Sequence, residues 1–266
     1  MERIILIETS TALCSAALAE DGKIVAYRES SAPKAHASLT AVFIQEMLEE
    51  HGVKIADCDA VCVSMGPGSY TGLRVGVSTA KGLCFGAGKP LLAVGTLDTL
   101  VAQASSVIPS NVEESPSYKF IIPMVDARRM EVYTAVFESS VAPNSSSVIP
   151  SSSSVIPSSS SVIPSGVEES PAYRQVTETA PVIVDESSFA EYLEQGPCLF
   201  IGDGAGKCAD VIRHPNARFV QCCPKASSML SPALAAYRAG DFKDVAYFEP
   251  FYLKEFVATV SKKKMW

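Results

Sequence analysis

The chain has 266 residues, 47% of them apolar, and a formal net charge of −7. This length and apolar content suffice for one or two sizeable cores and exclude a wholly disordered protein. The acidic balance argues against a surface that binds nucleic acid directly, because neutralising phosphates requires clustered Lys and Arg.

The first apolar run, residues 3–9, is interrupted by Glu8, so it predicts a strand rather than a secretion signal. The most apolar later window, residues 83–102, contains a lysine, a proline and an aspartate. Such residues disfavour a membrane-spanning helix of about 20 residues. We therefore expect a cytoplasmic protein that does not bind membranes.

Alternating and periodic apolar residues predict an α/β lobe in the first part of the chain. A tight turn at Asp21-Gly22 joins the second and third predicted strands. Ser38 and Gly52 bound the first predicted helix. The expected elements are strands at 3–9, 12–20 and 23–30, a helix at 38–52, a strand at 59–65, a helix at 71–88 and a strand at 89–95.

The second part of the chain repeats this mixture, which predicts a second lobe with a mixed sheet. Its expected elements are strands at 119–127, 130–138, 182–185 and 198–203, and helices at 187–195, 205–213 and 227–239. We expect a first lobe over 1–104 and a second over 118–138 and 172–226. The region 227–253 is expected to pack back on the first lobe.

Two Ser/Pro-rich segments, 105–117 and 139–171, do not fit a compact fold. The stretch 105–119 recurs almost letter for letter at 160–174. Segments of this composition bury too little apolar surface to offset their ordering entropy. We interpret both as insertions and expect them to be dispensable for folding.

The stretch "GPGSYTGLRVG", residues 66–76, is a glycine-rich turn between a strand and a helix. A helix N-terminus with free N–H groups is a possible phosphate site, but the turn lacks the Lys-Ser/Thr of a P-loop. A simple strand-to-helix turn explains it equally well. The residues that would contact a nucleotide are Thr9, Ser10, Gly66, Gly68, Ser69 and Thr71.

One face of the following helix is nearly bare, because Gly72, Gly76, Ala80 and Cys84 recur every four residues. Another backbone could approach this face closely. The spacing leaves two alternatives open, packing inside the domain or packing against a partner.

Catalytic equipment is sparse. Glu8 ends the first strand, where nucleotide-binding folds usually place the shorter Asp. The cluster "GDGAGK" at 202–207 departs from the P-loop pattern. The eight cysteines and three histidines show no spacing typical of a metal site. We predict no catalytic residues and no metal site.

The segments "IETST", "SMGPGSYTGLRVGVSTAKGL", "AVGTLDTL" and "IIPMVDARRMEVYTAVF" closely resemble the TsaB family. These proteins are partner subunits of the bacterial machinery that makes threonylcarbamoyladenosine at position 37 of tRNA. The resemblance covers the chain to about residue 252, apart from the two insertions. It implies the two-lobed fold of actin, sugar kinases and Hsp70 ATPases, and a close paralogue of the TsaD subunit.

This resemblance implies a non-catalytic scaffold that dimerises with a TsaD-type transferase and activates it. Further implied partners are a TsaE-type ATPase, tRNA through the complex, and a second copy when the chain is alone. No cofactor is required, although ATP or ADP could bind at the heterodimer interface. The expected interface comprises Leu39, Phe43, Gly72, Arg74, Val75, Gly76, Thr79 and Ala80.

An alternative from another class is an enzyme in its own right, either a nucleotide hydrolase or a glycopeptidase-like metallopeptidase. Such an enzyme should present a metal-ordering carboxylate or a pair of histidines. In the TsaD-type subunit a His pair on a helix binds the metal, whereas here His36 is followed by Thr40 four residues on. This difference favours the scaffold.

Overall fold

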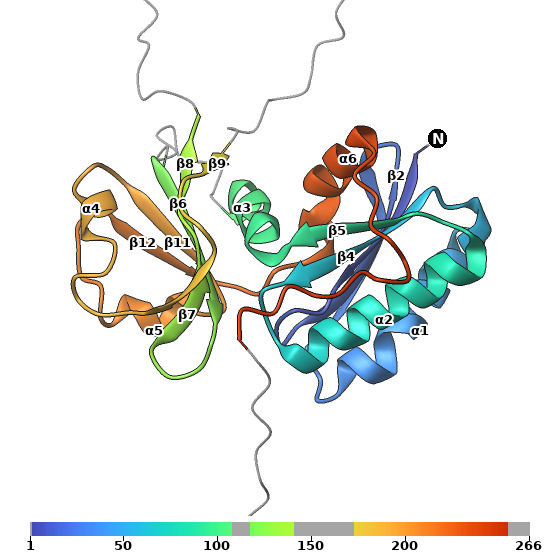
Figure 1. Cartoon of the computed structure of the whole chain (residues 1–266), viewed down its shortest axis with the longest axis horizontal. Coiled ribbons are helices and arrows are strands. Elements are labelled where there is room, and N and C mark those ends of the chain that lie inside the picture. Colours follow the sequence, from blue (N-terminus) through green and yellow to red (C-terminus); the bar gives the residue numbers. More distant parts are fainter. Residues whose placement is uncertain (1, 108–117, 141–172, 255–266) are drawn as a thin grey trace, which may run out of the picture.

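The computed structural model describes residues 2–107, 118–140 and 173–254, and the Ser/Pro segments lie almost wholly outside these ranges. The chain forms two lobes, each built on a mixed β-sheet with helices (Figure 1). This is the α/β arrangement predicted from the sequence. No helix in the described ranges has the length and apolar character needed to cross a bilayer.

The first lobe is built on a five-stranded sheet in the order β3-β2-β1-β4-β5. β1, β2 and β3 are antiparallel neighbours, whereas β4 and β5 run parallel to β1. Asp21 and Gly22 turn the chain between β2 and β3 with φ of 46° and 77°. The strands are β1 (Arg3–Glu8), β2 (Cys14–Glu20), β3 (Lys23–Ser30), β4 (Ala60–Gly66) and β5 (Leu91–Gly95).

The second lobe repeats this topology in the order β10-β7-β6-β11-β12. β6 pairs antiparallel with β7 and parallel with β11, as β1 does with β2 and β4. Its strands are β6 (Phe120–Asp126), β7 (Glu131–Thr134), β8 (Phe137–Ser139), β9 (Tyr173–Gln175), β10 (Ala180–Ile183), β11 (Cys198–Gly202) and β12 (Ala217–Gln221).

Helices cover both faces of the first sheet (Figure 1). α1 (Ala35–Glu50) and α2 (Tyr70–Ala87) pack on the face that carries Ile5 and Ile7. The opposite face, with Ile4 and Leu6, packs on η2 (Ala226–Met229) and α6 (Leu230–Ala239). Alternate residues of β1 therefore enter two different cores, which explains its unbroken apolar run.

The other helices are short or lie between the lobes. α3 (Thr96–Val107) packs against strands of both sheets, β5 in one and β6 in the other. η1 (Ile55–Asp57) precedes β4. In the second lobe, α4 (Ala190–Leu193) and α5 (Ala205–Ala209) precede β11 and β12.

Several predictions about the elements were wrong or incomplete. The expected strand at 130–138 is two strands, β7 and β8, and β9 was not predicted. α3 was not predicted, and it extends into residues 105–107, which the Ser/Pro composition assigns to an insertion; Leu97, Leu100 and Ala104 are its buried face. α1 begins at Ala35, three residues before the expected cap. β12 was also missed, because its residues alternate only partly between buried and exposed positions.

After α6 the chain crosses the first lobe as an extended segment, residues 241–254, which we call the strap (red in Figure 1). Lys243 N–H donates to the Leu91 carbonyl at 2.7 Å. Phe251 N–H donates to the Met65 carbonyl at 2.7 Å. The strap thus runs from the edge of β5 to the end of β4 and reaches the second lobe beyond it.

Gln103 of α3 ties this helix to the chain that returns from the second lobe. Its side-chain Nε2 donates to the Cys223 carbonyl at 3.0 Å, and its Oε1 accepts from the Lys225 N–H at 3.0 Å. Gln103 is only 3% exposed. Both hydrogen bonds are therefore partly shielded from bulk water.

We expect Gln103→Leu to lower the free energy of unfolding by about 1–3 kcal/mol, because it strands a partly buried carbonyl and a partly buried N–H. Urea denaturation measures the change. Gln45→Leu, on the exposed side of α1, is the control and should change stability by less than about 0.5 kcal/mol. Equal effects of the two substitutions would contradict this role of Gln103.

Candidate functional site

The end of β1 is where the first lobe would meet a ligand, since ligands of open α/β sheets bind at the carboxyl ends of the strands. Here four consecutive polar residues, Glu8, Thr9, Ser10 and Thr11, are at most 5% exposed. Glu8 Oε1 accepts the Ser10 N–H at 2.7 Å. Polar side chains at this position are thus covered by the protein itself.

The glycine-rich turn provides that cover. Ser69 N–H donates to the Ser10 carbonyl at 2.6 Å. A Cβ at Gly68 would lie 2.3 Å from the same carbonyl oxygen, and a Cβ at Gly72 would lie 2.1 Å from the Thr9 carbonyl oxygen. Only glycine permits this contact of backbone on backbone. The turn is therefore explained by packing within the lobe.

The six residues expected at a nucleotide fall into two groups. Thr9, Ser10 and Gly66 are buried, so a ligand could touch them only if the turn moved. Ser69 and Thr71 are exposed at the start of α2, and Gly68 is half-buried. The Ser69 side chain caps α2 by accepting the Gly72 N–H at 3.3 Å. A nucleotide contact stays a prediction.

The small-residue face of α2 is occupied by the chain's own first lobe. A Cβ at Gly76 would lie 2.2 Å from Thr9 Oγ1 and 3.4 Å from Val63. Ala80 and Cys84 belong to the core cluster on this side of the sheet. Gly72, Gly76 and Ala80 are thus not available to a partner, and the interface predicted at these three residues was wrong.

The remaining interface residues divide in the same way. Phe43 is buried in the core beside α1, and Leu39 packs against that core. Phe43 therefore faces inward, and its assignment to a partner surface was wrong, whereas Leu39 is half-buried and stays a candidate. Arg74 is exposed, and Val75 and Thr79 are half-buried on the outer side of α2. These three residues stay candidates for a partner contact.

Glu8 is chemically unusual because its carboxyl group is fully buried. Its Oε2, and the hydroxyl oxygens of Thr9, Ser10 and Thr11, have no hydrogen-bond partner among the described residues. Burial raises the pKa of the Glu8 carboxyl, and the hydrogen bond from the Ser10 N–H opposes this rise. Burial thus disfavours the charged form of the carboxyl, which is the form that binds a metal ion.

His36, which the sequence places four residues before Thr40 on the first helix, contacts the backbone. Its Nε2 lies 2.9 Å from the Thr11 carbonyl oxygen. The Thr40 hydroxyl donates to the His36 carbonyl at 2.6 Å and lies 3.3 Å from Cys14 Sγ. Across the described part of the chain, no three His, Cys, Asp or Glu side chains gather as a metal site would require.

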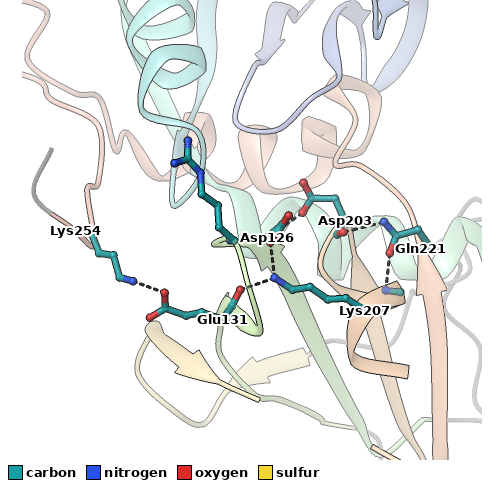
Figure 2. A network of polar contacts seen from close by, with 8 residues as sticks. Asp126, Glu131, Asp203, Lys207, Gln221 and Lys254 are labelled. Carbon is teal, nitrogen blue, oxygen red and sulfur yellow. Dashed lines mark hydrogen bonds and ion pairs between the residues drawn. The ribbon is translucent and has the colours of Figure 1, made fainter. Parts of the chain in front are cut away.

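The second lobe has a charged network at the matching position, the carboxyl ends of β6, β11 and β12 (Figure 2). Lys207 of α5 forms an ion pair with Asp126 and donates to the Glu131 carbonyl at 2.7 Å. Asp126 N–H donates to Asp203 Oδ1 at 2.9 Å. Unlike Glu8, Asp126 is 44% exposed at its side chain.

Gln221 at the end of β12 completes this network. Its Nε2 donates to the Asp203 carbonyl at 2.8 Å, and its Oε1 accepts the Gly206 N–H at 2.6 Å. Burial raises the pKa of the Asp203 carboxyl. The glycines of 202–207 stand out in the sequence, whereas Asp126, Glu131 and Gln221 were missed, since only the fold brings three strand ends together.

Comparison with known proteins now defines the class of protein. Residues 29–247 match the family model described as TsaD: tRNA N6-adenosine threonylcarbamoyltransferase. The match spans most of the chain, and the chain belongs to this family. Its curated relatives include proteins named tRNA threonylcarbamoyladenosine biosynthesis protein TsaB, which confirms the predicted resemblance to TsaB.

The Escherichia coli K12 relative is 34% identical over 136 residues, which are 51% of this chain and 55% of that protein. The Bacillus subtilis 168 relative is 30% identical over 135 residues, again 51% and 55%. The matched part of the chain thus spans about half the length of these relatives.

Among solved structures, YeaZ from Pseudomonas aeruginosa superposes with a TM-score of 0.72 at 22% identity, covering 95% of this chain and 100% of that one. A second structure, of a P. aeruginosa protein with similarity to peptidase YEAZ, has a TM-score of 0.73 at 22% identity, covering 96% and 100%. Together with the repeated sheet topology, these likenesses confirm the two-lobed fold class.

Two glycines of α2 give a matched test of the packing. We expect Gly72→Ala to destabilise the protein by about 1–3 kcal/mol, because its Cβ would collide with the Thr9 carbonyl. Gly82→Ala has no atom within 4 Å of the added Cβ and should stabilise the helix by about 0.5–1 kcal/mol. Thermal melts compare the two. A neutral Gly72→Ala would contradict the backbone contact.

Glu8→Gln should change how stability depends on pH. The pKa of Glu8 is raised in the folded state. The amount that protonated Glu8 adds to the free energy of unfolding is therefore fully present below its unfolded pKa of about 4.3. The contribution is lost as the pH rises through the folded pKa, and each pH unit between the two pKa values costs about 1.4 kcal/mol. We expect the glutamine variant to lose less stability than wild type between pH 5 and pH 8.

Urea denaturation at a series of pH values measures this difference. Glu186→Gln, on the exposed surface of the second lobe, is the control and should follow wild type. Parallel pH profiles for Glu8→Gln and wild type would show that Glu8 titrates alike in the folded and unfolded chains.

Proposed function

We propose that this chain is a non-catalytic partner subunit that binds a TsaD-type transferase and activates it in the formation of threonylcarbamoyladenosine in tRNA. The family match and the TsaB relatives support this assignment. The acidic chain, at −7, suits a subunit that meets tRNA through its partner rather than directly.

The observation that carries the non-catalytic part of the proposal is the sealed end of β1. A catalytic carboxylate must reach its substrate or metal ion, but Glu8 is 0% exposed and lies at the strand end that the turn of residues 66–72 covers. The backbone of this turn fills the space above Thr9 and Ser10. The first lobe is therefore built as a solid body, which suits a scaffold.

Several further parts of the proposal follow from the family. A TsaE-type ATPase is the second expected partner, ATP or ADP is a possible ligand at the heterodimer interface, and a homodimer is a possible state without the partner. We place the protein in the cytoplasm, where tRNA is modified. The exposed side of α2 is the contact surface that we propose.

The rival hypothesis, a hydrolase, has one structural feature in its favour. The Asp126 and Lys207 pair is charged and partly exposed in the second lobe. A nucleotide or a peptide could reach this ion pair, whereas neither could reach the buried Glu8. The two hypotheses differ in what the isolated chain should do.

Reconstitution decides between them. With the cognate transferase, the accessory ATPase, ATP and the threonylcarbamoyl adenylate, we expect tRNA modification that falls at least about tenfold when this chain is omitted. The isolated chain should release no phosphate from ATP above the rate of the Asp126→Asn and Lys207→Met variants. Robust hydrolysis that these variants abolish would establish the enzyme and overturn the scaffold.

A further inference from the structure

The strap and α2 enclose a groove of about 350 Å³ on the outer side of the first lobe. From α2 it is lined by Tyr70, Arg74, Ser78 and Lys81, and from the strap by Phe248 and Tyr252. The α2 residues recur at helical spacing, so they form one outward stripe. This stripe is separate from the small-residue face, which packs inward.

The groove is held open by contacts at both ends. Lys81 Nζ donates to the Ala246 and Phe248 carbonyls at 3.0 and 3.1 Å. The rings of Tyr70 and Tyr252 lie 4.9 Å apart at an angle of 40°. Because both walls are anchored, the groove is a preformed feature rather than a gap beside a loose segment.

Arg74 is the available cation in this groove. Its guanidinium lies 5.4 Å from the centre of the Tyr70 ring, a cation–π contact that presents the planar group to solvent. In the described part of the chain it forms no ion pair. Lys81, in contrast, already has two carbonyl partners.

Aromatic side chains are unusually exposed around the groove. Tyr247, next to the lining residue Phe248, is 84% exposed, and Phe85, one turn after Lys81 on α2, is 85% exposed. Phe251 and Tyr252 are 42% and 36% exposed. Aromatic residues and Arg are enriched where proteins bind other proteins, and exposed apolar groups that gather on one side mark such sites.

We propose that this groove receives an acidic segment of the partner subunit, with a carboxylate paired to Arg74 and apolar atoms packed on the rings of Tyr70 and Tyr252. This inference rests on the proposed function, since it assumes the transferase partner. The guanidinium, which has no ion-pair partner in the described ranges, selects a carboxylate, and the exposed rings of Phe85, Tyr247 and Phe251 near the groove suit a protein segment rather than a small molecule.

Two substitutions test the proposal, one that reverses a positive charge in the groove and one that removes a negative charge from it. Arg74→Glu should weaken heterodimer formation about 30-fold or more, because it removes one member of a desolvated charge pair and repels the other. Glu249→Gln, which removes the one carboxylate on the strap side of the groove, should leave affinity unchanged or strengthen it. Ile183→Ala, exposed on the second lobe, is the control and should bind as wild type.

Isothermal titration of each folded variant with the transferase subunit measures these affinities, and circular dichroism checks the fold. Arg74→Met separates charge from packing, since it keeps a long stem over Tyr70; it should weaken binding less than Arg74→Glu. If wild type binds the transferase and Arg74→Glu binds it equally well, the groove is not the partner contact. The proposed function would still stand. Absence of wild-type binding would overturn the proposed function itself.

Two other occupants give different results. A second copy of this chain in the groove would make Arg74→Glu disrupt the homodimer in sedimentation while heterodimer affinity stays unchanged. If residues 255–266 of the chain itself occupy the groove, Arg74→Glu should have no effect in a chain shortened to end at Lys254. Either result would overturn the assignment to an acidic segment of the partner.

Discussion

The contact between the glycine-rich turn and the end of β1 determines the rest of the first lobe. Backbone atoms meet there, with 2.6 Å between Ser69 N and the Ser10 oxygen. This distance leaves no room for side chains at Gly68 and Gly72. Because α2 begins at this contact, its direction, the residues it buries and the side it exposes all follow from it. The covered Glu8 is a result of the same packing.

The two lobes share a topology but treat the ends of their central strands differently. In the first lobe the strand end carries a buried carboxyl group covered by the backbone of the glycine-rich turn, whereas the second lobe has a partly exposed network of Asp126, Lys207 and Gln221. Burying a charge requires strong compensation, while an exposed ion pair requires little. One lobe thus behaves as a rigid core and the other keeps polar groups in reach of solvent.

The sequence predicted the fold well where periodicity was strong. The apolar runs of β1 and β2, the Asp21-Gly22 turn, and the glycines at Gly66, Gly68 and Gly72 indicated strands and tight turns at the right positions. The repeat of small residues along α2 predicted a close approach but could not say which backbone approaches. Both alternatives give the same spacing, and only the fold places Thr9 against Gly76.

The elements and contacts that the sequence did not predict also have physical explanations. α3 lies between two sheets, and its apolar positions at Leu97, Leu100 and Ala104 form too short a series to stand out before a Ser/Pro tract. The network of the second lobe joins residues from β6, α5 and β12, which lie far apart in sequence. On α2 the sequence predicted contacts on both sides, because the glycine spacing marks the inward side while Arg74, Val75 and Thr79 lie on the outer side.

The return of η2, α6 and the strap to the first lobe has a consequence for synthesis. The sheet of this lobe is complete once β5 has been made, but the core on one of its two faces is completed by residues 226–239, and α2 receives the strap later still. During translation the second lobe therefore emerges while the first still exposes Ile4 and Leu6. Domains usually fold as units from the N-terminus during synthesis, but here the first lobe must wait for the second, so a ribosome-bound chain needs protection until α6 appears.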